Sequence, residues 1–207
     1  MKLYYAPGAC SLASRICLHE SGVPATYERV DTKAKRTESG ADYLAINPKG
    51  VVPALVLDDG ELVTENVAIL TLLAERDRRL APDGPLAGIR LIEMLSYLST
   101  ELHIAFKPFW HSDSAAEKAK AGELVAKHLL LIESRMKGAF LFGESFTVAD
   151  AYLFVMLRWA RDFGVAIPAG IGIYFAHIAE RSTVRTALAE ESLPEITVEP
   201  AIVIEPI

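Results

Sequence analysis

The first part of the chain has apolar residues in the two spacings that distinguish strands from helices. Residues 2–5 (KLYY) and 25–31 (ATYERVD) are short and rich in aromatic and β-branched residues, which is typical of strands. Between them, residues 11–21 place apolar side chains at helical spacing and are followed by Gly22, a residue that commonly ends helices. The pattern predicts a strand, a helix and a second strand.

A hairpin and another helix are predicted next. Residues 51–63 (VVPALVLDDGELV) form two apolar runs joined at Asp59-Gly60, which is a strong hairpin signal. Residues 65–76 (ENVAILTLLAER) have one apolar helical face. The expected order is strand, helix, strand, irregular segment, strand, strand and helix.

The pattern changes at residues 79–88 (RLAPDGPLAG), where two prolines and two glycines lie among charged residues, as in an inter-domain linker. Helical spacing then continues almost to the end of the chain. The predicted helices cover residues 86–106, 116–137, 150–164, 171–180 and 182–190.

Two of these helices have clear start signals. Ser114 and Glu117 have the spacing of a capping box, and Thr147 and Asp150 have the same spacing with a shorter acid. Pro108 restricts the continuation of the helix that precedes it.

We therefore expect an α/β domain at residues 1–80 and an all-α domain at 87–192, the fold class α/β plus all-α. Residues 193–207 combine β-branched residues with three prolines, so they are expected to form an extended tail, for which we have no function.

Composition excludes some classes of partner. The chain has 207 residues and a formal charge of −6, which gives no support for nucleic acid or an anionic membrane as a partner. No apolar run is long enough to span a bilayer, and no signal-peptide pattern opens the sequence. We expect a cytoplasmic protein with no membrane partner.

The two cysteines, Cys10 and Cys17, are seven positions apart. On one helix their Cα atoms would lie roughly 10 Å apart, too far for a disulfide. The five histidines are scattered without a metal-ligand spacing, so no metal is expected. A free thiol at Cys10 remains.

Cys10 lies where a Pro-Gly turn leads into a helix. The N–H groups of a helix start stabilise an anion, so the position favours a thiolate of Cys10 or of a bound ligand. Ser11 offers a hydroxyl donor to the same point. Equally, Cys10 could be a small buried residue and Ser11 a helix cap.

Two further features add chemistry. A cis bond between Val52 and Pro53 would turn the Val52 backbone outward, where it can pair with a peptide; alternatively, Pro53 begins an edge strand. Glu65 can bind an ammonium group and Asn66, at a helix start, a carboxylate. Alternatively, Glu65 is an ordinary acid of a first helical turn.

Together these features match the requirements for holding a thiol peptide such as glutathione. At the stretches YYAPGACSLASR, NPKGVVPAL, DDGELVTENVAI, STELH and FTVADAYLF the chain resembles the glutathione transferases, most nearly their bacterial beta class. The resemblance covers about residues 1–192, in the order and spacing of the family.

The resemblance implies a thioredoxin-like N-terminal domain, a helical C-terminal domain and a homodimer. It implies that Cys10 faces the glutathione sulfur, that Val52 pairs with the cysteinyl backbone before a cis Pro53, and that His103 approaches the thiol. The other glutathione contacts that it implies are Ser11, Lys35 at the glycyl end, Glu65 and Asn66 at the γ-glutamyl end, and Ser96, Thr100 and Glu101 near His103, partly across the dimer interface.

Two positions depart from the family. Asn66 stands where much of the wider family has Ser, and Ile104 follows His103 where close relatives can carry a polar residue, which makes the second-substrate pocket drier. Aromatic residues of the second domain could line a pocket for a hydrophobic electrophile, although we interpret them as core: Phe106, Phe109, Trp110, Tyr152 and Trp159.

The resemblance thus predicts a detoxifying enzyme that activates the thiol of glutathione, its co-substrate, for attack on electrophilic small molecules. Cys10 adds thiol–disulfide exchange as a further activity. The alternatives are a glutathione-dependent isomerase or lyase and a non-catalytic binding module. The sequence does not identify the electrophile.

Overall fold

The computed structural model describes residues 1–196 of the chain, and its strands form one sheet in the order β3-β2-β1-β4-β5. Strand β1 is parallel to β2 and antiparallel to β4, and the outer pairs β2–β3 and β4–β5 are antiparallel. The strands are β1 (Lys2–Tyr5), β2 (Thr26–Asp31), β3 (Arg36–Thr37), β4 (Ala54–Val56) and β5 (Leu62–Thr64).

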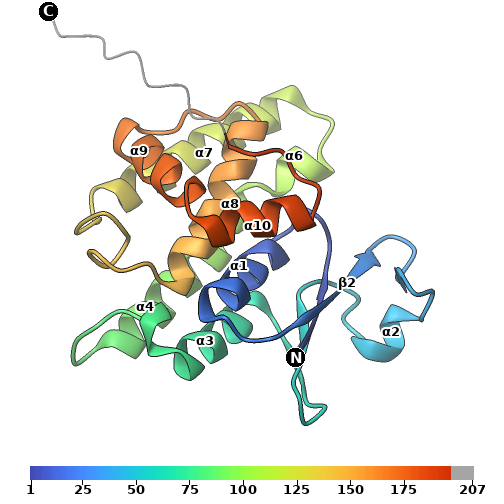
Figure 1. Ribbon diagram of the computed structural model, residues 1–207. Helices are drawn as coiled ribbons and strands as arrows, with labels where there is room; N and C mark the ends of the chain where they lie inside the picture. The colour runs from blue at the N-terminus through green and yellow to red at the C-terminus, as the bar shows by residue number, and fades with distance from the viewer. Residues whose placement is uncertain (197–207) are drawn as a thin grey trace, which may run out of the picture.

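Each face of this sheet buries alternate residues of the central strand β1. Leu3 and Tyr5 join the large core formed with α1 (Ser11–Ser21) and α3 (Asn66–Arg76). Tyr4 faces the other way and packs with Tyr43 of the short helix α2 (Tyr43–Ile46). Figure 1 shows α1 and α3 on one side of the strands and α2 on the other.

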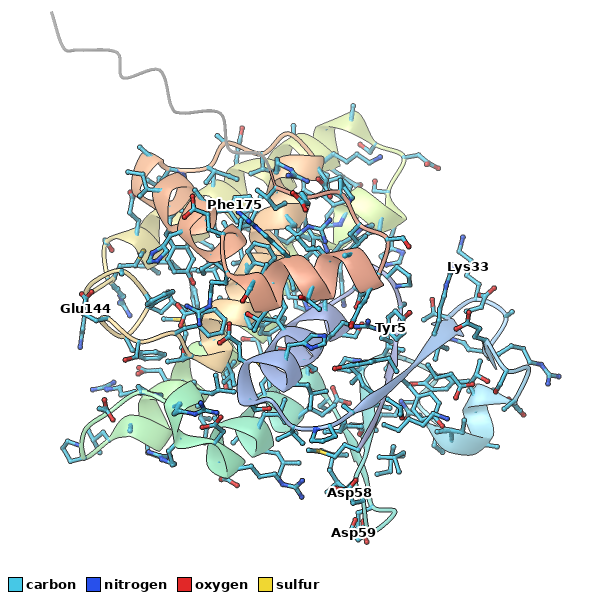
Figure 2. The ribbon with its side chains drawn as sticks, in the orientation of Figure 1. Tyr5, Lys33, Asp58, Asp59, Glu144 and Phe175 are labelled. Carbon is cyan, nitrogen blue, oxygen red and sulfur yellow. The ribbon has the colours of Figure 1, made fainter. Side chains whose placement is uncertain are left out.

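The hairpin predicted at Asp59-Gly60 is confirmed, because β4 and β5 pair on either side of it. Asp58 and Asp59 project from its tip at the lower edge of the molecule (Figure 2). The segment expected to be irregular contains β3 and α2. Both elements are too short for a periodic pattern to show in the sequence.

The remainder of the described chain is helical, which confirms the expected fold class. The elements are η1 (Arg78–Leu80), α4 (Ala87–Tyr97), η2 (Leu98–Leu102), α5 (His103–Ala105), α6 (Lys107–His111), α7 (Ala115–Glu133), α8 (Val148–Asp162), α9 (Ala169–Ala179) and α10 (Ser182–Glu190).

Helix α8 is the centre of this helical part. Its residues from Val148 to Ala160 are buried all round, as expected of a helix that is enclosed by others. It packs against α1 and α3 of the α/β part and against α4 and α9 (Figure 1). Helix α10 also packs against α1, so the two parts of the chain share one apolar core.

Of the two predicted capping boxes, the one at α8 is complete and the one at α7 is half formed. Asp150 accepts the backbone N–H of Thr147 at 2.7 Å and completes the capping box of α8. At α7, Ser114 accepts the N–H of Glu117, but the Glu117 carboxylate binds Ser112 instead of closing the box.

The expected continuous helix 86–106 is interrupted. The five residues of η2 form a π-helical turn directly before His103. Pro108 falls in the first turn of a separate short helix, α6, where its missing N–H leaves no intrahelical bond unmade.

The domain limits 1–80 and 87–192 stay predictions, although η1 ends at Leu80 and α4 begins at Ala87. Most of the tail predicted at 193–207 lies outside the described residues. Within them, Leu193 packs against the core. No described helix has the length and hydropathy to cross a membrane.

Candidate active site

A cleft of about 340 Å³ lies between the two parts of the chain. One wall is the turn that leads from β1 into α1 and contains Pro7, Gly8, Ala9 and Cys10. The other wall consists of side chains of the helical part: His103, Trp110 and Trp159. The structure therefore brings together Cys10 and His103, which are 93 positions apart in the printed sequence.

Cys10 is the residue that precedes the first turn of α1, and it is a free thiol. Its Sγ lies 3.6 Å from the carbonyl oxygen of Val52. The backbone N–H groups of Cys10 and Ser11 act on the sulfur and lower the pKa of the thiol, as expected at a helix start. Burial outweighs them, and the negative charge of Glu65 adds to it, so the pKa of Cys10 is raised to about 12. Of the two alternatives left open for this position, a thiolate of Cys10 or of a bound ligand, the raised pKa favours the ligand's.

Ser11 does not direct its hydroxyl into the cleft, contrary to expectation. The side chain is fully buried, and its Oγ bonds both the carbonyl oxygen and the N–H of Ala6, each at 3.3 Å. The hydroxyl closes the Pro-Gly turn, and the backbone N–H is what Ser11 contributes beside Cys10.

The turn before Cys10 is held from the helical part of the chain at Gly8. The Gly8 N–H donates to Oε2 of Glu191 at 2.9 Å, and Nε1 of Trp159 donates to the Gly8 carbonyl at 2.8 Å. Gly8 has φ 69, a conformation in which a side chain would be strained. Sequence reasoning missed both anchors, because neither partner is near Gly8 along the chain.

Glu191 belongs to a buried group of charges. Nε of Arg15 lies 3.2 Å from its Oε1, and the guanidinium of Arg15 is held between the rings of Tyr5, labelled in Figure 2, and Tyr27. Burial raises the pKa of Glu191 to about 7, although Gly8, Arg15 and Arg158 all favour its charged form.

The backbone around Val52 is fixed by side chains on one side. The peptide bond between Val52 and Pro53 is cis, as expected. The carbonyl of Val51 accepts bonds from Tyr43 Oη and Asn47 Nδ2, both at 2.8 Å. Nζ of Lys35 bonds the carbonyl of Gly50 at 2.8 Å, so Lys35 lies beside the same segment.

Glu65 and Asn66 lie at the start of α3 but differ in exposure. Glu65 has φ 70, and its exposed carboxylate pairs with Nζ of Lys49 at 2.6 Å. Asn66 is buried, and its Oδ1 accepts the hydroxyl of Ser14 at 3.0 Å. Among the described residues, Nδ2 of Asn66 has no hydrogen-bond partner. The expected contact of this buried side chain with a carboxylate therefore stays a prediction, for which Nδ2 and the backbone N–H are the donors.

His103 begins α5, and its Nδ1 lies 2.8 Å from the hydroxyl of Tyr152. Its ring centroid is 4.9 Å from that of Trp159. Burial, with a smaller effect of Lys107, lowers the pKa of His103 to about 4, so the imidazole is neutral at pH 7.

The structure does not bring three of the predicted contact residues to Cys10, namely Ser96, Thr100 and Glu101. Thr100 donates to the carbonyl of Ser96 at 3.0 Å, and Thr100 and Glu101 line a separate cleft of about 490 Å³ with Ile104. Within one chain their predicted contact with glutathione is therefore not supported.

Two of the aromatic residues interpreted as core, Trp110 and Trp159, line the cleft, and Trp159 is at the same time part of the buried core. Trp110 is 43% exposed, and its ring is perpendicular to that of Trp159 at 4.9 Å. Phe106 and Tyr152 are buried, and Phe109 stacks on Phe163. Within residues 1–196, no group of three or more His, Cys, Asp or Glu side chains is placed to hold a metal ion.

Comparison with known proteins matches both parts of the chain. Residues 8–76 match the family model "Glutathione S-transferase, N-terminal domain", and residues 115–185 match "Glutathione S-transferase, C-terminal domain".

Among curated relatives, glutathione S-transferase GstA of Escherichia coli O157:H7 is 45% identical over 200 residues, which are 93% of this chain and all of that protein. A sphingomonad glutathione S-transferase complexed with glutathione superposes with TM-score 0.86 at 43% identity, over 94% of this chain and 100% of that one. The bacterial beta class enzyme of Sphingomonas chungbukensis superposes with TM-score 0.85 at 42% identity, with the same coverage.

Proposed function

The chain belongs to the glutathione S-transferase family and, within it, to the bacterial beta class, and from this premise we propose that the cleft beside Cys10 holds the thiol of glutathione. As a glutathione S-transferase it is an enzyme with glutathione as a substrate. The observation that most strongly supports the position of the thiol is the meeting of Cys10 and His103 at one cleft, with the Val52 carbonyl 3.6 Å from the Cys10 sulfur.

The cleft supplies donors for a thiolate that comes from the substrate. The N–H groups of Cys10 and Ser11 stabilise negative charge at the start of α1. The raised pKa keeps the proton on Cys10, whose S–H group donates to the Val52 carbonyl at 3.6 Å and would have to turn from it to donate to the glutathione sulfur. Each unit by which such donors lower the thiol pKa corresponds to about 1.4 kcal/mol. Cys10 thus assists the thiolate of bound glutathione.

The peptide part of glutathione is assigned to the rim of the α/β part. Val52 presents its backbone for pairing with the cysteinyl residue, next to a segment that Tyr43 and Asn47 hold rigid. Lys35 is close enough to this segment to meet the glycyl carboxylate. The γ-glutamyl ammonium would share the Glu65 carboxylate with Lys49.

The electrophile is assigned to the aromatic side of the same cleft. Trp110 is partly exposed there, and the bulk of Trp159 lies behind it. An apolar, flat electrophile fits such a wall. These residues do not identify the electrophile.

The raised pKa of Cys10 argues against disulfide exchange as the main activity. An attacking cysteine needs a thiolate, and the thiolate fraction of Cys10 at pH 7 is small. Exchange would form a mixed disulfide from the Cys10 thiol and glutathione disulfide, with release of one reduced glutathione.

Conjugation and exchange are separated by Cys10→Ala. We expect the wild type to bind glutathione in calorimetry and to conjugate it to 1-chloro-2,4-dinitrobenzene. We expect Cys10→Ala to keep most of the conjugation and to lose exchange. Binding without turnover across a panel of electrophiles would indicate a binding module, and turnover without a conjugate an isomerase or lyase.

The proposal also includes a homodimer and a cytoplasmic location. Exposed apolar side chains on the outer faces of α4 and α7, such as Ile89, Ile92 and Leu131, support a second copy packed there. In such a dimer, Thr100 and Glu101 would contribute across the interface. Light scattering after gel filtration tests it, and a monomer at micromolar concentration would contradict it.

A further inference from the structure

Tyr152 of α8 is the hydrogen-bond partner of His103. Its side chain is 1% exposed, and its hydroxyl lies 2.8 Å from Nδ1 of His103. Among the described residues, Nδ1 of His103 is the hydrogen-bond partner that the structure shows for this hydroxyl. The hydroxyl therefore meets one polar partner in an apolar interior.

Burial determines which way this hydrogen bond runs. A buried phenolic proton without an acceptor is costly, and among the described residues Nδ1 of His103 is the acceptor that the Tyr152 hydroxyl meets. The proton of Tyr152 therefore goes to Nδ1 of His103. Burial raises the pKa of the Tyr152 hydroxyl, so it stays a donor at every working pH.

A neutral imidazole that accepts at Nδ1 carries its proton on Nε2. The ring of His103 lines the cleft together with Cys10, and Nδ1 is occupied by Tyr152, so Nε2 is the nitrogen left for a ligand. A general base would need a bare Nε2, which this arrangement does not supply.

We propose that Tyr152 is a positioning residue that fixes the tautomer of His103, so that Nε2–H donates a hydrogen bond to the sulfur of glutathione. The role rests on the proposed position of the thiol in this cleft. The pair then links α8, which carries Tyr152, to α5, which carries His103 at the cleft.

Two substitutions of His103 separate a donor from a base. The amide nitrogen of Gln reaches the place of Nε2, whereas that of Asn reaches the place of Nδ1. We expect His103→Gln to keep kcat/KM within a few-fold of the wild type and His103→Asn to lower it about tenfold, the value of one hydrogen bond to a charged group. Equal loss in both variants would overturn the donor role.

The tautomer itself is read from the 15N shifts of the imidazole in the wild type. His103→Gln identifies the signals, because its spectrum lacks them. We expect a protonated Nε2 and a bare Nδ1 in the wild type, and a mixture of tautomers in Tyr152→Phe. A protonated Nδ1 in the wild type overturns the proposal even if Tyr152→Phe does not fold.

Tyr97 provides a matched control, because its hydroxyl lies 2.6 Å from Nδ1 of His128, away from the Cys10 cleft. Tyr97→Phe should alter only the His128 signals. Tyr152→Phe should raise the pKa of bound glutathione, followed by thiolate absorbance, while Tyr97→Phe leaves it unchanged. If the wild type binds no glutathione, the proposed function fails; if it binds and the two variants behave alike, only the role of Tyr152 fails.

Discussion

The backbone N–H of Gly8 donates to Oε2 of Glu191 at 2.9 Å, so the turn that presents Cys10 is anchored to the residue that follows α10. The carboxylate of Glu191 also lies beside the buried guanidinium of Arg15. One side chain therefore aligns the substrate-facing turn and lies against a buried cation of α1.

Removing this carboxylate should destabilise the protein strongly. Glu191→Ala leaves the Gly8 N–H without its acceptor and Arg15 with Glu190 as its remaining carboxylate, and we expect a loss of about 2–3 kcal/mol in the free energy of unfolding, measured in urea. Glu190 pairs with Arg15 from a side chain that is 38% exposed, so Glu190→Gln should cost less than about 1 kcal/mol. Equal costs for the two would contradict the anchoring role.

The charge of Glu191 should also appear in the pH dependence of stability. Because its folded pKa is raised to about 7 from 4.5, the folded chain holds more protons than the unfolded chain between these values. Its contribution to stability therefore falls as pH rises from about 4.5 to 7. Relative to the wild type, Glu191→Gln should gain stability over this window. A difference that is independent of pH would contradict the raised pKa.

His103 should change the stability of the protein with pH in the direction opposite to Glu191. Its folded pKa is lowered to about 4 from 6.5, so between these values the unfolded chain binds the proton and the folded chain does not. Its contribution to stability falls as pH drops from 6.5 to 4, by up to about 3 kcal/mol. In His103→Gln this part of the pH dependence should be absent, as read from urea midpoints. An unchanged profile would show that the imidazole is not desolvated.

Cys10 should react slowly with alkylating agents. A pKa of about 12 in place of 9.0 reduces the thiolate fraction at pH 7 about a thousandfold. Iodoacetamide labelling of the wild type, followed by mass spectrometry, should therefore be slow at pH 7 and should still accelerate above pH 9. Cys17 is fully buried, so Cys10→Ser should take up no label. If Cys10 were labelled rapidly, with a rate that reaches its plateau below pH 8, Cys10 would itself be a reactive nucleophile and its pKa would not be raised.

Asp150 should be among the residues most important for folding. Its buried carboxylate accepts the N–H of Leu141, the N–H and hydroxyl of Thr147, and the hydroxyl of Tyr174. Asp150→Ala leaves these donors without a partner, and we expect a loss of at least about 3 kcal/mol in urea unfolding. Asp83, an exposed residue, is the control, with an expected change within about 0.5 kcal/mol for Asp83→Ala. A comparable loss of stability in Asp150→Ala and Asp83→Ala would contradict the role of Asp150 in the capping box of α8.

Local signals in the sequence were sufficient where the structure depends on neighbouring residues. The turn at Asp59-Gly60 and the box of Thr147 with Asp150 are both encoded within four positions. The family resemblance added Cys10, Val52 and His103, which meet at the cleft or beside it. The short β3 and α2 left no periodic pattern.

What sequence reasoning missed depends on contacts between distant segments. The anchors of Gly8 come from Trp159 and Glu191, and no local pattern pairs these residues with the turn. The choice between a thiolate of Cys10 and one of a bound ligand stayed open, because a helix start is visible in the sequence, whereas the burial that raises the pKa of Cys10 is not. Trp110 has helical neighbours like a core residue, and only the packing of α6 shows that it is exposed.

The most direct test of the central claim is a crystal structure of the protein with glutathione. The account predicts the glutathione sulfur within hydrogen-bonding distance of Cys10 Sγ and His103 Nε2, with the cysteinyl backbone paired to Val52. Glutathione bound in the separate cleft of Thr100 and Glu101 alone, or with its sulfur turned away from Cys10, would contradict it.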